Sequence, residues 1–410
     1  MTTIGEVAEI FDGPHATPEK TETGPYFLSI SSLEEGRLDL TKSAHLGETD
    51  FKKWTKRVTP KKGDLLFSYE TRLGEVALMP DGIRACLGRR MGLLRPKKDK
   101  VISEYLLYAY LSPSFQQTII SNTIRGATVD RLALNEFPDF SIRIPCIEEQ
   151  EKVANLLQAI DAKIDCNKRI NAELEAMAKT LYDYWFVQFE FPDAKGKPYK
   201  SSGGKMVYNA TLKREIPTGW EDGMASDLFD FNPSLSLSIN TEASYIDMSS
   251  LPVTGFMTNA PERKVFAGGM KFQNGDVVVA RITPCLENGK TALISLLKDS
   301  EVGFGSTEFI VLRGKKTPLS AFATQLSRSV SFRQFAISNM TGTSGRKRID
   351  ASTLETFSLP LPPEDLLLKY EKTARACFER MTNNAQENQQ LAKLRDWLLP
   401  MLMNGQVTVA

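Results

Sequence analysis

The chain has 410 residues, enough for roughly three units of ~150 residues, and its 41% hydrophobic and 25% charged residues are ordinary for a globular protein. The formal net charge is +1, so no field of the whole molecule draws it to nucleic acid and any DNA-binding surface must be local. The sequence starts without the pattern of a signal peptide, and no apolar stretch approaches the ~18 residues of a membrane span. Five scattered cysteines and two histidines form no metal-ligand pattern. We therefore expect a reduced, cytoplasmic protein with no metal site.

Residues 1–145 are predicted to form a strand-rich domain. Short apolar runs at 26–30 and 64–69 are bounded by Gly, Pro and polar residues, which is typical of strands. Residues 190–219 are rich in Gly, Pro and polar side chains, and they predict a linker or a loop held loosely on the surface. A second strand-rich domain is expected over residues 220–361.

A long helix is predicted over residues 146–189, because residues 148–189 contain neither Pro nor Gly and their apolar residues recur at a mean spacing close to 3.5. At ~1.5 Å per residue this helix is on the order of 60 Å long and needs a partner of similar length. Residues 365–399 repeat the spacing, after Pro362-Pro363 and before Pro400, which is expected to end the helix. The predicted seam residues are Val153, Ile160, Ile164, Leu174, Leu181, Leu367, Tyr370, Met381, Leu391 and Leu398.

Asparagines also fall on or beside this seam, at Asn167, Asn384 and Asn388. A buried Asn in a coiled coil costs stability but fixes the register of the two helices. The alternative is that these side chains rotate to solvent.

The order of domain, helix, domain, helix predicts an internal repeat, and short matches occur in the same order in both halves. The second helix is shorter by one heptad, which keeps its seam on the same face. The predicted fold is α+β, with two strand-rich recognition domains separated by two long helices that pair as an antiparallel coiled coil with an internal pseudo-two-fold repeat. The matches are 63–66 with 275–278, 74–78 with 289–293, 94–95 with 312–313, 151–154 with 371–374 and 181–183 with 394–396.

Two domains held apart by a stiff rod suit a DNA target that is split into two parts. Arg can clamp guanine with two hydrogen bonds, and Lys can neutralise phosphate. The alternative for each cation is an ordinary solvated surface charge, but the loop at 345–348 combines three adjacent cations with small residues, which favours DNA contact. The DNA-binding candidates are Arg72, Arg89, Arg90, Arg125, Arg131, Arg281, Lys290, Arg346, Lys347 and Arg348.

No catalytic motif is complete in this sequence. Gly289-Lys290-Thr291 resembles the end of a phosphate-binding loop, but Pro284 stands where the motif needs Gly. His15 has no recognisable base–nucleophile partner. We expect no active site in this chain. The alternatives are a nuclease or nucleotide-driven enzyme with a cryptic site, and a structural adaptor whose domains bind protein rather than DNA.

Several segments of the sequence match the motifs of a known family, and the most specific of them is a proline-rich stretch followed by a Glu/Gln-rich helix start, present twice. The segments are Gly5–Gly13, Pro60–Asp64, Ile144-Pro145 with Glu148–Ala154, Leu181–Phe186, Gly219-Trp220, Phe304–Phe309 and Leu359–Pro363. Through these segments the whole chain resembles the specificity subunits of type I restriction–modification systems.

This resemblance implies domains 1–145 and 220–361 that each read one half of a bipartite, asymmetric DNA target. Residues 146–189 and 362–410, the latter with a C-terminal tail, would be the conserved helices that set the spacer between the halves. It implies double-stranded DNA, two methylation subunits and restriction–translocation subunits as partners. S-adenosylmethionine, ATP and Mg²⁺ would belong to those subunits, with no cofactor in this chain. Trp185, Phe186 and Trp397 are candidates for partner contact, since aromatic residues anchor interfaces, or they cap the rod.

Overall fold

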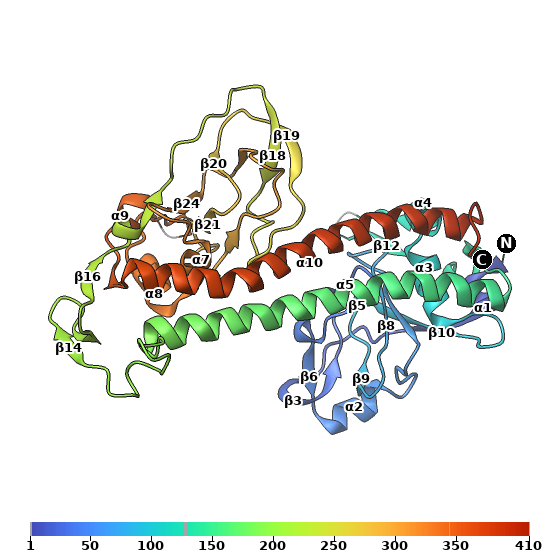
Figure 1. The fold of residues 1–410 in the computed structure, drawn as a ribbon. Helices are drawn as coiled ribbons and strands as arrows, with labels where there is room; N and C mark the ends of the chain where they lie inside the picture. Colours follow the sequence, from blue (N-terminus) through green and yellow to red (C-terminus); the bar gives the residue numbers. More distant parts are fainter. Residues whose placement is uncertain (1, 127–128, 344, 410) are drawn as a thin grey trace. The chain divides into compact units, whose positions relative to one another are not determined.

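The structure, a computed structural model, describes residues 2–126, 129–343 and 345–409. It divides the chain into two compact units (Figure 1). Unit 1 combines Met1–Lys163 with Leu391–Ala410, and unit 2 is the intervening segment Ile164–Gln390. Each unit therefore holds one globular domain together with part of each of the two long helices.

The domain of unit 1 is built on a four-stranded antiparallel sheet in the order β2 (Ala8–Asp12), β10 (Met91–Pro96), β7 (Leu65–Ser68) and β8 (Val76–Leu78). Successive side chains of a strand point to opposite faces. Leu65 and Phe67 pack with α3 (Ser103–Leu111) and α4 (Pro113–Ser121), whereas Leu66 packs into a separate core on the other face. Because both faces are buried, these strands are nearly continuous apolar runs.

Unit 1 also contains a second, smaller sheet of three strands. It has the order β6 (Ala44–Leu46), β3 (Lys20–Phe27) and β9 (Ala85–Cys86), and α2 (Glu48–Trp54) packs on it through a small apolar cluster. The remaining elements are β1 (Thr2–Thr3), α1 (Ile4–Val7), η1 (Ile30–Ser32), β4 (Leu33–Glu34), β5 (Arg37–Leu38), η2 (Leu40–Lys42), β11 (Thr123–Ile124), β12 (Arg131–Leu132), η3 (Phe137–Asp139) and β13 (Ser141–Ile142).

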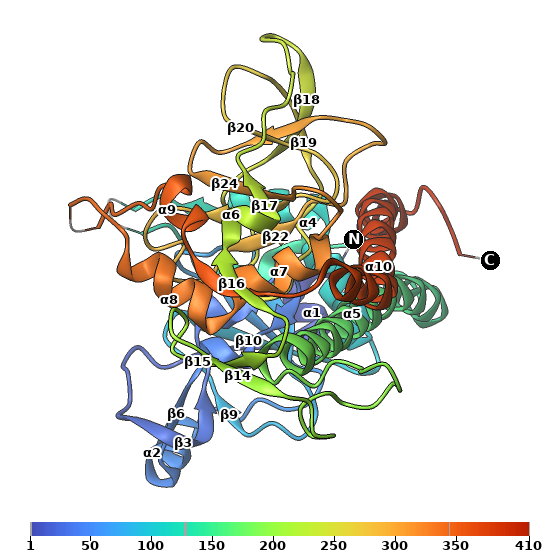
Figure 2. The same cartoon turned by 60° about the vertical axis from the view of Figure 1, so that its left-hand side comes forward.

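Unit 2 repeats this topology. Its main sheet has the order β17 (Phe229–Phe231), β24 (Phe309–Gly314), β21 (Val277–Ala280) and β22 (Thr291–Leu293), with α7 (Ser320–Arg328) packed against it and α8 (Val330–Ser338) following (Figure 2). A second sheet has the order β19 (Glu262–Val265), β18 (Glu242–Ile246), β23 (Gly303–Gly305) and β20 (Met270–Phe272). In both units one strand pair of the second sheet is parallel, β3 with β9 and β18 with β23. The other elements are β14 (Met206–Asn209), β15 (Arg214–Pro217), β16 (Glu221–Met224), α6 (Ala225–Leu228), α9 (Ala351–Glu355) and β25 (Ser358–Leu361).

The two long helices are α5 (Ile147–Tyr182), which continues into a π-helical turn η4 (Asp183–Val187), and α10 (Glu364–Asn404). Within unit 1, Arg395 pairs with Asp161 at 3.0 Å. Within unit 2, the Asn384 amide donates a 2.8 Å hydrogen bond to Asn171. In unit 2 Asn167 also pairs with Asn388, so residue numbers rise along α5 as they fall along α10, and the helices are antiparallel there, as predicted for a coiled coil.

The predicted coiled-coil seam residues are buried or half-buried within their units. Asn167 and Asn384 are also buried and do not rotate to solvent, and Asn167 donates a 2.9 Å hydrogen bond to Asn388. Of the predicted seam residues, six are buried (Val153, Ile160, Ile164, Leu367, Tyr370 and Met381) and four are half-buried (Leu174, Leu181, Leu391 and Leu398).

The prediction that Pro400 ends the second helix is wrong, because α10 runs on to Asn404. A proline removes one helical hydrogen bond and crowds the preceding turn, at a cost of ~3 kcal/mol. Here Leu402 and Met403 are buried in the core of unit 1, and their carbonyl groups accept hydrogen bonds from Arg143 at 3.3 and 3.1 Å. These tertiary contacts hold the final turn in place.

Residues 190–219 also differ from the loose linker that composition predicts. Strands β14 and β15 form a hairpin within this segment, and Ile216 is buried. Phe191 stacks between Tyr199 and Trp220, with ring centroids 4.7 and 5.3 Å away. The segment is thus tied to the core of unit 2 by aromatic residues that a count of Gly and Pro does not weigh.

Candidate nucleic-acid interface

Three loops of unit 1 meet beyond the ends of β7 and β10. The Tyr69 amide donates a hydrogen bond to the Arg90 carbonyl at 3.1 Å, and the Leu132 amide donates to the Tyr69 carbonyl at 2.9 Å. Arg90 has a φ of +66°, a left-handed conformation that is costly for a residue with a side chain. Its guanidinium pairs with Glu70 at 2.9 Å, which holds this unusual turn and leaves Arg89 exposed beside it.

The same backbone hydrogen bonds recur in unit 2, but an acidic residue, Glu308, stands where unit 1 has Arg90. The Arg281 amide donates to the Glu308 carbonyl at 3.0 Å, and the Ile349 amide donates to the Arg281 carbonyl at 3.0 Å. Here the carboxylate of Glu308 directly precedes β24, just as Arg90 directly precedes β10 in unit 1. Glu308 accepts from Arg348 at 2.7 Å, and this hydrogen bond, partly opposed by burial, lowers the pKa of Glu308. The two junctions share a backbone but present different side chains.

The predicted DNA-binding residues divide by what they already contact. Arg72 donates to the Ile30 carbonyl and pairs with Glu75 at 3.0 Å, and Lys290 donates to the Met248 carbonyl at 2.7 Å. These hydrogen bonds and ion pairs lie within one domain. The ion pairs of Arg90, Arg281 and Arg348 also lie within their own domains. The remaining candidates, Arg89, Arg125, Arg131, Arg346 and Lys347, are exposed. The loop neighbours Ala127, Thr128 and Ser344 lie outside the described residues.

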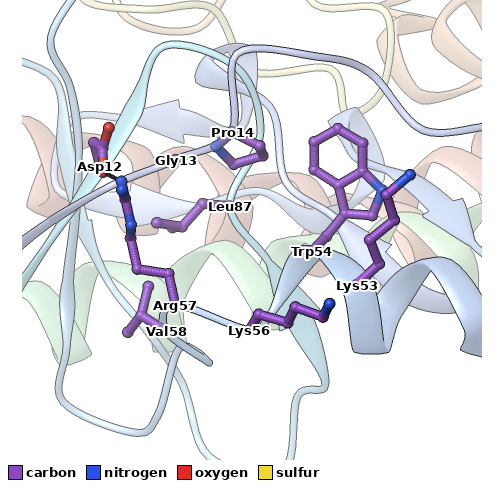
Figure 3. Close-up of a pocket in the computed structure, with 9 residues that line it drawn as sticks. All are labelled: Asp12, Gly13, Pro14, Lys53, Trp54, Lys56, Arg57, Val58 and Leu87. Carbon is purple, nitrogen blue, oxygen red and sulfur yellow. Dashed lines mark hydrogen bonds and ion pairs between the residues drawn. The ribbon is translucent and has the colours of Figure 1, made fainter.

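Next to the first junction lies a basic pocket that sequence reasoning missed (Figure 3). It has a volume of about 300 Å³ and is formed between the turn after β2 and the end of α2. We call it the α2 pocket. Its lining residues are Asp12, Gly13, Pro14, Lys53, Trp54, Lys56, Arg57, Val58 and Leu87.

The walls of the α2 pocket differ in chemistry. In Figure 3, Trp54 and Lys53 stand on the right, Asp12 and Arg57 stand on the left, and Leu87 lies between them. Trp54 is held by an edge-to-face contact with Phe27 at 6.3 Å, so its position is set by the small sheet. Arg57 pairs with Asp12. The pocket therefore combines an aromatic side, a cationic rim and a hydrogen-bonding wall.

The backbone places this pocket directly beside the Arg89–Arg90 loop. The Gly13 amide donates to the Met91 carbonyl at 2.8 Å, and a Cβ at Gly13 would lie 2.6 Å from the Gly88 carbonyl oxygen. Only glycine allows this approach. The sequence signal for the site was Lys52–Lys62, KKWTKRVTPKK, a basic run containing a tryptophan.

Two of the three aromatic partner candidates are wrong. Trp185 and Phe186 are each only 6% exposed, because the π-helical turn η4 directs them into the core of unit 2. Phe186 contacts Tyr370 and Phe322 with ring centroids 5.0 and 4.9 Å away. They cap the helix pair of unit 2, which was the alternative reading. Trp397 is 61% exposed on α10.

Within the described ranges, no three His, Cys, Asp or Glu side chains gather in a way that could hold a metal ion. In the same part of the chain, no helix is both long and apolar enough to span a membrane. Two copies of one mixed domain, each followed by a long helix that pairs with the other, define a duplicated binding protein.

Comparisons with known proteins agree with this class. The sequence model of the type I restriction modification DNA specificity domain matches residues 1–176. The chain is 24% identical to the type I restriction enzyme MjaIX specificity subunit of Methanocaldococcus jannaschii, over 97% of this chain and 87% of that protein. It is 21% identical to the HindI specificity subunit of Haemophilus influenzae, over 85% of this chain and 87% of that protein. Both relatives are type I restriction enzyme specificity subunits, and both are similar to this chain over most of its length.

The fold is shared with a solved member. The crystal structure of the type I restriction–modification S subunit from M. genitalium superposes with a TM-score of 0.57 at 14% identity, covering 98% of this chain and 95% of that chain. At this identity the likeness concerns the fold alone.

Proposed function

We propose that this chain is the non-catalytic DNA sequence-specificity subunit of a type I restriction–modification complex. Each globular domain reads one half of a bipartite, asymmetric target, and the paired helices set the spacer and dock two methylation subunits. Restriction–translocation subunits join through that assembly, and S-adenosylmethionine, ATP and Mg²⁺ are used by the partner subunits. Nothing among the relatives or in the described residues favours the adaptor alternative.

The observation that carries the proposal is the duplicated junction with different side chains. Both domains use the same backbone hydrogen bonds to bring three loops together, but one places Arg90 where the other places Glu308. A shared backbone with exchanged charges supports two readers of different sequences, because base readout depends on the side chains that the loops present. Exposed cations beside each junction supply the phosphate contacts that position a protein on DNA.

Mapping of methylated adenines in cells that carry this chain and its partner subunits tests the proposal. We expect a single two-part sequence with a fixed spacer, and we expect it to disappear when the gene for this chain is deleted. A methylation pattern unchanged by the deletion would contradict the assignment. In vitro, the purified chain should bind duplex DNA with a salt slope of ~0.9 for each phosphate that it neutralises.

A further inference from the structure

The α2 pocket has more structure than phosphate binding on a duplex requires. A cation that neutralises a phosphate needs only to be exposed on a surface. This pocket is a hollow of about 300 Å³ with buried Leu87 and Val58 in its lining, at the lower end of the size of small-molecule sites. Its aromatic and apolar surfaces have no role in contacts to phosphate.

The composition of the pocket matches a single nucleotide. Trp54 offers a ring on which a base can stack, and this contact is tolerant of sequence because every base has a π-face. Lys53 and Lys56 are exposed, and neither forms an ion pair with a described residue, so both are available to the sugar–phosphate backbone. On the opposite wall, Arg57 and Asp12 pair with each other, so this side of the pocket is an internal ion pair.

A base in a duplex can reach such a pocket only by leaving the stack. Proteins that extrude a base spend a few kcal/mol on unstacking and unpairing, and this cost is lowest where the base is already unpaired. Arg89 follows Leu87 of the pocket after one residue and is exposed, so backbone contacts are available beside the point of entry.

Cations on the second sheet of unit 2 already have partners, unlike Lys53 and Lys56. There, Arg263 on β19 pairs with Glu301, and Lys264 pairs with Glu262 at 2.9 Å. Lys264 also lies over the Tyr245 ring, 4.0 Å from its centroid. The cations and the aromatic ring of that region are thus already engaged with the domain itself.

We propose that the α2 pocket receives one unstacked nucleotide of the DNA, with its base against Trp54 and its phosphates on Lys53 and Lys56. The proposal rests on the proposed function as a DNA-binding subunit. It makes Trp54 a residue that contacts a base of the target, in addition to the loop arginines.

The test compares two fluorescently labelled duplexes of about 30 base pairs, roughly three helical turns, binding to the full chain. One is fully paired and the other carries a single unpaired thymidine at its centre. The unpaired base removes the cost of extrusion, so the bulged duplex should bind at least about fivefold more tightly than the paired duplex.

Variants assign the preference to the pocket. Trp54→Ala should abolish the preference for the bulged duplex, and Trp54→Phe should keep part of it. Lys53→Ala with Lys56→Ala should weaken both duplexes and lower the salt slope by up to ~1.8. Lys98→Ala, an exposed cation beyond the far end of β10, is the matched control and should change neither.

The outcomes separate the two proposals. Equal affinity of the wild-type chain for both duplexes overturns the nucleotide pocket and leaves the DNA-binding function standing. A preference that survives in Trp54→Ala also overturns it, because another site would then receive the base. Absence of binding to either duplex overturns the proposed function. Circular dichroism and thermal melting of Trp54→Ala verify that its loss of preference does not reflect unfolding, and Trp54→Phe, which keeps an aromatic ring, provides a second variant.

Discussion

The guanidinium of Arg313 donates two hydrogen bonds, each 2.7 Å long, to the carboxylate of Asp276. The same pair occurs in unit 1, where Arg95 donates to Asp64 at 3.0 and 2.7 Å. In both domains the aspartate also accepts a backbone N–H three residues earlier, at 2.8 Å. The duplication is therefore preserved in a buried polar contact as well as in strand order.

Removal of one member of this pair should destabilise unit 2. Asp276 is 1% exposed, and Asp276→Ala leaves Arg313 and a backbone N–H without their acceptor. Loss of one partner of a buried ion pair costs about 3–5 kcal/mol. The effect is measured by urea unfolding of the full chain, with proteolytic cleavage within residues 164–390 as the readout for unit 2.

Asp81→Ala is the matched control for this measurement. Asp81 pairs with Lys62 at 3.3 Å, and both side chains are largely exposed. Exposed pairs contribute about 0–1 kcal/mol. Equal losses for the two variants would show that the Asp276 pair is energetically no different from a surface contact.

A second prediction concerns the asparagines between the long helices in unit 2. Asn384→Leu leaves the Asn171 side chain without its donor and should cost about 1–3 kcal/mol. Asn171→Leu combined with Asn384→Leu should recover much of that loss, because two apolar residues replace the polar pair. A double-mutant cycle measured by urea unfolding gives the coupling energy. Additive effects of the two single changes would contradict a direct contact.

The pair should also fix the register of the helices, as a buried Asn does in coiled coils. We expect the double Leu variant to protect its helix amides from hydrogen exchange less uniformly than the wild type, although its free energy of unfolding is similar. Uniform protection would mean that the apolar seam alone determines register.

Glu371 should make the stability of unit 2 depend on pH. Burial raises the pKa of its carboxyl group from 4.5 to about 7, although the group accepts hydrogen bonds from the amides of Phe322 and Ala321 and lies near Arg375, all of which lower it. A raised pKa means that the folded state holds the proton more tightly. The contribution to stability is therefore full below about pH 4.5 and is lost as the pH rises through about 7.

Glu371→Gln removes this dependence and keeps an oxygen acceptor for one of the two amides, which bond to different carboxylate oxygens. The free energy of unfolding of the variant relative to the wild type should therefore rise by on the order of 3 kcal/mol between about pH 5 and about pH 8, on top of a constant cost for the lost hydrogen bond. Other titrating groups cancel in this difference. A difference that does not change with pH would refute the raised pKa.

The sequence predicts the architecture of this chain well, for physical reasons. A seam such as Val153 to Ile164 repeats at a period that only a long helix pair satisfies, and Asp64 and Asp276 stand in the same short motif. What it misses depends on neighbours distant in the chain. Pro400 is kept in a helix by the contacts of Arg143 with the last turn, and no local rule includes that residue.

The candidate interface is predictable in outline only. Arg72 and Arg346 look alike in sequence, yet Arg72 is tied to Glu75 and Arg346 is exposed. Trp185 is a candidate for partner contact in the sequence, but the structure buries it in the core of unit 2 through the π-helical turn. Counting charges could find the basic run around Trp54, whereas the hollow beside it exists only once β2 and α2 are brought together.

The exposed cations of the second junction should contribute to DNA affinity without contributing to stability. Arg346→Ala and Lys347→Ala should each lower the salt slope of DNA binding by ~0.9 at most, with the melting temperature unchanged. Lys315 and Lys316, an exposed pair just beyond the opposite end of β24, form the matched control. Salt slopes that fall equally for both pairs would argue that unit 2 binds DNA without a preferred face.

Trp397 and Trp185 allow a clean comparison between partner binding and stability. Trp397 is exposed, so Trp397→Ala should leave the free energy of unfolding within about 0.5 kcal/mol. We expect it to weaken association with the methylation subunits by at least about 1–2 kcal/mol, since tryptophan is enriched among residues that dominate binding energy. Trp185→Ala removes a buried ring 5.9 Å from Tyr370 and should cost about 3–5 kcal/mol of stability. Analytical ultracentrifugation of the mixed subunits measures the first effect and urea unfolding the second, and unimpaired assembly of Trp397→Ala would remove that tryptophan from the interface.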